Sequence, residues 1–183
     1  MPVRDTESLL GFFSSSQMNR VLYEAAHIAR VVLKVEASVI FLLSSGHELH
    51  SASWDGRELS SATVSLDGLY VKSLWEGRRS ISWHQRDRCK DPELVAVLDA
   101  MGLEGGMILP LIMNDWYYGV WLVATAKSRS FSDSDESILS ALRDNIALTT
   151  ESIMISEENF RLQREASALY EINKEISQLM DLN

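Results

Sequence analysis

Apolar residues recur every three or four positions near the start of the chain, which is the spacing of a helix with one buried face. Ser14 and Gln17 precede this stretch with the spacing of a capping box. We therefore predict a helix that begins near Ser14 and buries one stripe. The stripe consists of Met18, Val21, Leu22, Ala25, Ile28, Ala29, Val32 and Leu33.

Runs of β-branched and large apolar residues predict strands at 38–43, 48–54, 107–113 and 117–125, with a shorter one at 80–83. Turn residues separate the first two runs, and Asn114 with Asp115 separates the two at 107–125, so each pair is expected to form a hairpin. Pro110 is an objection to the third run, because proline donates no ladder hydrogen bond and favours an edge or a bulge.

Two short helices are expected between the hairpins, at about 68–75 and 92–101. For the second helix, Asp91 provides an N-cap and Pro92 occupies the first helical position, where its missing N–H costs nothing. Gly102 marks its end. The stretch 57–67 is rich in serine and carries only a weak pattern.

The last part of the chain predicts one long helix. Ser132 and Asp135 form an S-x-x-D cap, and neither proline nor glycine occurs from there to Met180. Two apolar stripes run along it. One contains Ile138, Leu142, Ile146, Ile153 and Phe160; the other, at seven-residue spacing, contains Leu148, Ile155, Leu162, Leu169 and Ile176.

A helix with two stripes needs two partners. One is expected to be the domain's own sheet and first helix. The seven-residue repeat is typical of a coiled-coil seam, so the other is expected to be the same helix of a second copy. An antiparallel hairpin within the chain is the alternative. Glu151, Glu158 and Glu165 stand in the neighbouring column of the seam, so the pairing is expected to be loose in its middle.

Composition limits the possible functions. The 183 residues are 46% hydrophobic and 23% charged, as in one globular domain with an extension, and the formal net charge of -9 disfavours a nucleic-acid partner. No run of about 18 apolar residues occurs, so no membrane span is expected. The single cysteine, Cys89, cannot form an intramolecular disulfide, which fits a reducing, cytoplasmic location.

Three short motifs, in order, carry a resemblance to the GAF family of sensory domains. Leu109, Pro110 and Leu111 are similar to its V-P-L strand, and Tyr118, Gly119, Val120, Trp121 and Leu122 to its I-G-V-L-x-L strand. Phe131, Ser132 and Asp135, followed by Ile138, Leu139 and Leu142, are similar to its F-S-x-x-D entry into the exit helix. The resemblance covers about 14–155, leaving an N-terminal tail at 1–13 and a coiled-coil linker at 156–183.

The resemblance implies an α+β fold, in which the first and last helices cover one face of a central antiparallel sheet. Smaller helices and loops then close a ligand pocket on the other face, from about 68 to 107. The candidate lining residues are Tyr70, Trp75, Trp83, His84, Met101 and Met107. Aromatic and thioether side chains suit a mostly apolar pocket for a small molecule. The alternative is that they are ordinary core residues and that no ligand binds.

Other chemistry of the family is poorly matched. The N-K-F-D-E signature of the cyclic-nucleotide-binding members is absent, and Cys89 is followed by Lys90 rather than by the histidine usual after a bilin-binding cysteine. Neighbouring arginines could lower the pKa of Cys89, although an ordinary surface thiol is the simpler interpretation. The catalytic members that reduce methionine sulfoxide use several cysteines, so no catalytic residue is predicted.

The four histidines, His27, His47, His50 and His84, are dispersed, so no metal site is predicted. Of the four, only His84 is expected beside the pocket, because it follows Trp83 at the end of a predicted strand. The cofactor and the small-molecule ligand therefore remain unassigned.

These observations predict a small-molecule-sensing and dimerisation module of a signal-transduction protein such as a histidine kinase, a diguanylate cyclase or a transcriptional regulator. Leu169, Tyr170 and Glu171 resemble a linker that opens a further signalling domain. A ligand-free dimerisation spacer is the first alternative. A sensor that carries haem or a chromophore is the second.

Overall fold

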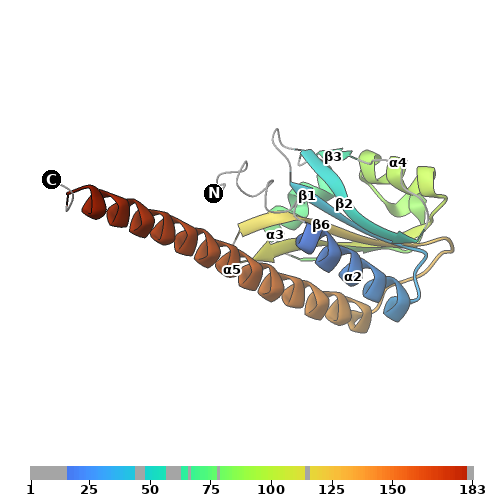
Figure 1. Cartoon of the computed structure of the whole chain (residues 1–183). Helices are drawn as coiled ribbons and strands as arrows, with labels where there is room; N and C mark the ends of the chain where they lie inside the picture. Colours follow the sequence, from blue (N-terminus) through green and yellow to red (C-terminus); the bar gives the residue numbers. More distant parts are fainter. Residues whose placement is uncertain are drawn as a thin grey trace. The chain divides into compact units, whose positions relative to one another are not determined.

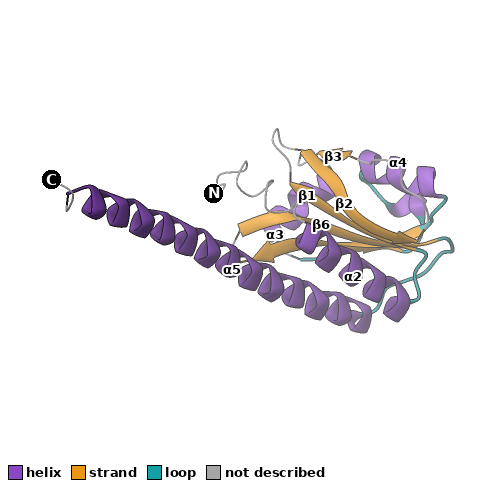
Figure 2. Ribbon diagram, in the orientation of Figure 1, coloured by secondary structure: helices purple, strands orange, loops and turns teal. Residues whose placement is uncertain are grey.

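The computed structural model describes residues 16–43, 48–56, 63–65, 67–77, 79–113 and 116–180. Figures 1 and 2 show its helices and strands. In chain order they are α2 (Ser16–Leu33), β1 (Ala37–Leu43), β2 (Glu48–Gly56), β3 (Thr63–Ser65), α3 (Leu69–Gly77), β4 (Ile81–Trp83), the 3₁₀ turn η1 (Arg86–Arg88), α4 (Pro92–Met101), β5 (Gly105–Met113), β6 (Trp116–Thr125) and α5 (Asp133–Met180). The chain divides into two units, 1–147 and 148–183.

The strands form one six-stranded sheet in the order β3-β2-β1-β6-β5-β4, with every neighbouring pair antiparallel. Both predicted hairpins are confirmed, as β1 with β2 and β5 with β6. Pro110 is accommodated because β4 pairs only with Gly106, Met107 and Ile108. At Pro110 the strand β5 therefore has a partner on one side only, where Val120 of β6 lies opposite.

Side chains alternate between the two faces of the sheet, and both faces are covered. The central strand β1 is buried from Ala37 to Leu42, which explains its unbroken apolar run. Val39 and Phe41 pack with α3 and α4 in one core cluster, whereas Ile40 belongs to the other face. The cluster also includes Tyr70, Leu74, Trp83, Cys89, Leu94, Leu98, Met101, Leu103, Ile108, Val120 and Leu122.

Helix α2 confirms the predicted first helix but buries a narrower stripe. Met18, Leu22, Ala26, Ala29 and Leu33 are buried. The prediction was wrong for Ile28 and Val32, whose exposed fractions are 44% and 51%. Both lie at the flank of the buried arc, because successive residues turn by about 100° around a helix.

Helix α5 is continuous from Asp133 to Met180, as the absence of proline and glycine predicted. Leu139 and Ile146 are buried in its first part. Further along, the predicted seam residues Leu148, Ile155 and Leu162 are 68%, 56% and 50% exposed. The side chains of Leu169 and Ile176 lie outside the described residues. Within the described part of the chain, no helix is long and apolar enough to span a membrane.

Candidate functional site

Three of the predicted pocket residues, Tyr70, Trp83 and Met101, meet in the core cluster between the sheet and helices α3 and α4. The rings of Tyr70 and Trp83 lie 5.8 Å apart between centroids. Met107 is buried but alternates with Ile108 of the cluster along β5, so it faces the opposite side of the sheet. His84 is exposed, and the side chain of Trp75 lies outside the described residues.

Tyr70 fastens helix α3 to the segment that leads into α4. Its hydroxyl donates a hydrogen bond to the Arg88 carbonyl at 3.2 Å and accepts one from the Lys90 N–H at 3.0 Å. Burial raises the pKa of this hydroxyl, which therefore stays protonated and able to donate. The two bonds hold the backbone on either side of Cys89.

Asp91 is a fully buried carboxylate that joins the two helices of this face. Its Oδ1 accepts hydrogen bonds from the N–H groups of Glu93 and Leu94, at 3.1 and 3.3 Å. This is the predicted N-cap of α4. Its Oδ2 accepts the Tyr70 N–H at 2.9 Å, so the same carboxylate also caps the start of α3.

Trp83 carries a buried hydrogen-bond donor, its indole N–H. The side chain is 4% exposed, and its Nε1–H has no acceptor among the described residues. The indole lies over Gly106 of β5, where a Cβ would overlap its Cζ2 atom. A buried donor without a partner costs about 1–3 kcal/mol. The site therefore contains a hydrogen-bond donor that no described residue satisfies.

Cys89 corrects two sequence-based expectations. Its side chain is buried rather than on the surface, and burial raises the pKa of the thiol instead of the arginines lowering it. Arg86 forms ion pairs with Asp99 at 2.5 Å and Glu104 at 3.8 Å. A raised pKa disfavours the thiolate, so the Cys89 side chain lacks the feature of an activated nucleophile.

A cavity of about 460 Å³ adjoins this cluster. It is lined by Gln85, Arg86, Asp87, Cys89, Val95 and Glu104. Cys89 also belongs to the core cluster and Val95 packs against it, so the cavity and the core share a wall. The sequence does not predict the polar lining residues, because residues 85–87 have the pattern of a solvated turn. The interleaved charges from Arg86 to Asp91 were the available signal.

The described residues contain no group of three or more His, Cys, Asp or Glu side chains that could hold a metal ion. The core cluster provides an apolar wall and a buried N–H donor, and the adjoining cavity is lined mainly by polar side chains.

Comparison with known proteins adds information on the fold. No family model matches the sequence, and no curated protein matches it either. Among solved structures, the blue-light-absorbing form of the PixJ GAF domain from Thermosynechococcus elongatus is similar with a TM-score of 0.68. The alignment covers 86% of this chain and 95% of that one, at 10% identity.

The chain has the GAF fold. The GAF domain/HD domain protein from Geobacter sulfurreducens is also similar, with a TM-score of 0.60 and 17% identity over 74% of this chain and 93% of that one. The phycoerythrobilin-bound GAF domain of a cyanobacterial phytochrome has a TM-score of 0.62 and 14% identity, over 80% and 95% of the two chains. At these identities the likeness concerns the fold alone.

The motifs that predicted the GAF fold have physical roles in it. Leu109, Pro110 and Leu111 lie in β5, and Tyr118 to Leu122 lie in β6 at the centre of the sheet. Gly119 is required there because a Cβ would overlap the carbonyl oxygen of Phe41 on β1. Ser132 and Asp135 hydrogen-bond each other at the start of α5.

Proposed function

We propose that this chain is a sensory module of a signal-transduction protein and that it binds a small organic molecule on the α3 and α4 side of its sheet. The GAF fold supports the proposal, because similar domains include a bilin-bound one and one joined to an HD domain. The observation that carries it is the buried Nε1–H of Trp83, which has no acceptor among the described residues. Trp83 lies in the same core cluster as Cys89, which lines a cavity of about 460 Å³. The proposed ligand supplies a hydrogen-bond acceptor to this donor.

A thermal-shift screen against metabolites tests this proposal. A ligand that binds only the folded state at 100 times its Kd adds about 2.7 kcal/mol to the free energy of unfolding, so the melting temperature rises by several degrees. The matched control is Trp83→Phe, which keeps an aromatic ring but removes the donor. A true hit is expected to shift the variant less. A screen without hits contradicts the proposal.

A ligand-free spacer is the second candidate, and one observation favours it. Leu74, Leu94 and Leu98 are fully buried in the cluster, so side chains fill much of the space between the sheet and the two helices. In that case a buried water is expected to accept the Trp83 N–H. The metabolite screen would then yield nothing, and Trp83→Phe would leave every signalling property unchanged.

A chromophore sensor is the third candidate, because the similar phytochrome domain is phycoerythrobilin-bound. Cys89 lines the cavity in this chain, but the next residue is Lys90 rather than histidine. Incubation of the purified protein with bilin or haem is expected to leave it without a visible absorption band. A stable band that Cys89→Ala abolishes would favour this candidate over the other two.

We further propose that α5 pairs with the same helix of a second copy. The exposed apolar side chains of Leu148, Ile155 and Leu162, at seven-residue spacing, support this pairing. Leu162→Lys is expected to weaken the dimer at least about tenfold, since a charge would be buried in the seam. Gln163→Lys adds the same charge at the adjacent exposed position and serves as control. A dimer unchanged by Leu162→Lys in analytical ultracentrifugation would remove the seam.

A further inference from the structure

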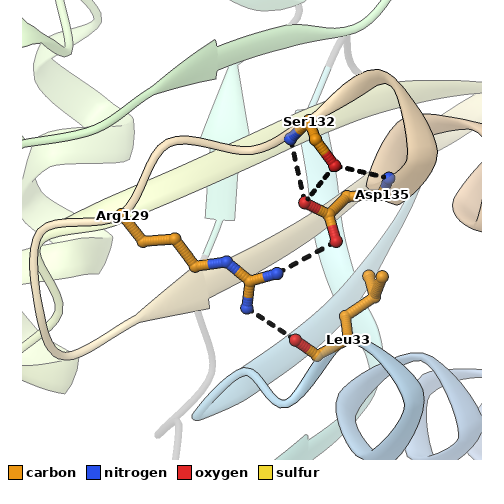
Figure 3. A network of polar contacts seen from close by, with 4 residues as sticks. All are labelled: Leu33, Arg129, Ser132 and Asp135. Carbon is orange, nitrogen blue, oxygen red and sulfur yellow. Dashed lines mark hydrogen bonds and ion pairs between the residues drawn. The ribbon is translucent and has the colours of Figure 1, made fainter.

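Arg129, in the loop between β6 and α5, contacts three separate parts of the domain. Its backbone N–H donates to the His84 carbonyl at 3.1 Å. Its Nη1 donates to the Leu33 carbonyl at 2.6 Å, and its Nη2 donates to Asp135 Oδ1 at 2.9 Å, as Figure 3 shows. One residue therefore joins the edge of the candidate site to helix α2 and to helix α5.

The His84 end of this connection belongs to the candidate site. His84 follows Trp83, whose buried N–H lacks an acceptor among the described residues, and it precedes Gln85, which lines the cavity. A ligand that accepts the Trp83 N–H or fills the cavity would act on both neighbours of His84. Any resulting shift of the His84 carbonyl reaches Arg129 through a direct hydrogen bond.

The Leu33 end lies at the C-terminus of α2. Leu33 is the last residue of this helix, and its carbonyl is among those without an intrahelical partner. Lys34 follows in the left-handed conformation, with φ of 54°, which ends the helix. The guanidinium thus donates to a carbonyl that lacks an intrahelical partner, at the negative end of the helix dipole, where a positive charge is favourable.

The Asp135 end lies in the first turn of α5. The carboxylate accepts hydrogen bonds from the N–H and hydroxyl of Ser132, at 2.9 and 3.0 Å, while Ser132 Oγ accepts the Asp135 N–H at 3.2 Å. Burial raises the pKa of Asp135, but the bonds from Ser132 and the charge of Arg129 outweigh burial and hold the pKa below its ordinary value. The carboxylate therefore stays ionised and keeps the guanidinium in place.

A second contact ties the other end of strand β4 to α5. Ser80 precedes β4, and its hydroxyl donates to Glu136 Oε1 at 2.5 Å. The strand that carries Trp83 is thus connected to the first turn of α5 at both of its ends. Because both ends of β4 are held by hydrogen bonds, a displacement of this strand would also displace the first turn of α5.

We propose that Arg129 couples the candidate site to the ends of α2 and α5. The biological role of this coupling rests on the proposed function. The coupling itself is a property of the fold and can be measured without a ligand. Coupling is reciprocal, so loosening Arg129 from the helices also loosens the site. Arg129 is a positioning residue in this scheme and touches no ligand.

The test follows the reaction of the buried Cys89 thiol with the disulfide reagent DTNB under native conditions, since this thiol lies in the wall of the site. Arg129→Ala is expected to increase the rate at least about fivefold, the lower end of typical coupling between sites. Arg129→Lys is expected to restore part of the protection. Asp135→Asn weakens the same link from the α5 side and should act in the same direction.

Ser132→Ala is the matched control, because it weakens the cap of α5 but leaves the ion pair between Arg129 and Asp135 intact. We expect Ser132→Ala to leave the rate of Cys89 labelling unchanged. The variant and the wild type are compared under conditions where urea unfolding gives them the same free energy of unfolding. An unchanged rate in both Arg129→Ala and Asp135→Asn would overturn the proposal. So would an equal increase in Ser132→Ala, since general fraying of α5 would then explain the effect.

The outcomes separate this proposal from the proposed function. Faster labelling of Cys89 in Arg129→Ala together with a metabolite screen without hits keeps the coupling and rejects the sensor. A ligand that stabilises the protein, with labelling insensitive to Arg129, keeps the sensor and rejects the coupling. Hydrogen exchange at the first turn of α5 provides the independent readout: Trp83→Phe is expected to change it only when Arg129 is present.

Discussion

Two buried tryptophans on opposite faces of the same sheet differ in one respect. Trp121 of β6 is fully buried, and its Nε1–H donates to the Ser38 hydroxyl on β1 at 2.9 Å. Trp83 of β4 is almost as deeply buried, yet its Nε1–H has no acceptor among the described residues. The two side chains carry the same group at similar depth. Of the two, only Trp121 has an acceptor within the part of the chain that the structure describes.

The difference between the two tryptophans distinguishes the two faces of the sheet. On the α2 face, the ring of Trp121 is buried by apolar packing and its N–H is hydrogen-bonded to Ser38. On the α3 and α4 face, the Trp83 N–H has no acceptor among the described residues, and its core cluster shares Cys89 with a polar cavity. The packing of the first face satisfies its buried tryptophan, and the second face is where we propose that a ligand binds.

The largest expected effect comes from a substitution at Gly119, where β6 lies against β1. Gly119→Ala would drive a Cβ into the carbonyl oxygen of Phe41, and a paired backbone cannot move aside. We expect the free energy of unfolding to fall by about 4 kcal/mol, measured by urea denaturation. Gly77→Ala is the control, because its Cβ would meet nothing within 4 Å. A tolerated Gly119→Ala would contradict the tight pairing of β1 with β6.

The next effect sharpens the comparison directly. Trp121→Phe removes ring volume and leaves the buried Ser38 hydroxyl without its donor, so a loss of about 3 kcal/mol is expected. Trp83→Phe removes the same volume but also an unsatisfied donor, so its cost is expected to be about 1–2 kcal/mol smaller. Equal losses in urea unfolding would mean that the Trp83 N–H is satisfied after all, and the proposed site would lose its main support.

The sequence predicts those parts of the fold that depend on residues close together in the chain. The hairpins, the Asp91 cap of α4 and the unbroken helix α5 each depend on neighbouring residues, and all three are confirmed. The sequence does not predict strand β3, because its three residues carry too little pattern and the strand depends on pairing with β2. Ile28 and Val32 were misassigned because periodicity alone does not fix the width of a buried face.

The candidate site was only partly predictable for the same reason. Aromatic residues marked Tyr70 and Trp83, but the polar lining from Gln85 and Glu104 is assembled by the pairing of β4 with β5. An unsatisfied N–H is a property of the folded surroundings and leaves no trace in the sequence. The role of Arg129 likewise depends on three partners that are distant along the chain.

The smallest expected effect concerns Asp135, one of two carboxylates that cap helices in this domain; the other is Asp91. Asp91 is fully buried and accepts three backbone N–H groups, whereas Asp135 is partly exposed and paired with Arg129. For Asp135 the folded-state pKa is lowered, so its contribution is present above the unfolded pKa of about 3.9 and is lost as the pH falls through the folded value.

Asp135→Asn keeps an acceptor for Ser132 but removes the charge that holds Arg129. We therefore expect the variant to be less stable by about 1 kcal/mol at pH 7, with the difference from the wild type shrinking below about pH 4 as the wild-type carboxylate becomes protonated. Urea unfolding at several values between pH 7 and pH 3 measures this. A difference that stays constant over the range would show that the charge of Asp135 does not stabilise the start of α5, and the ionic half of the Arg129 link would fail with it.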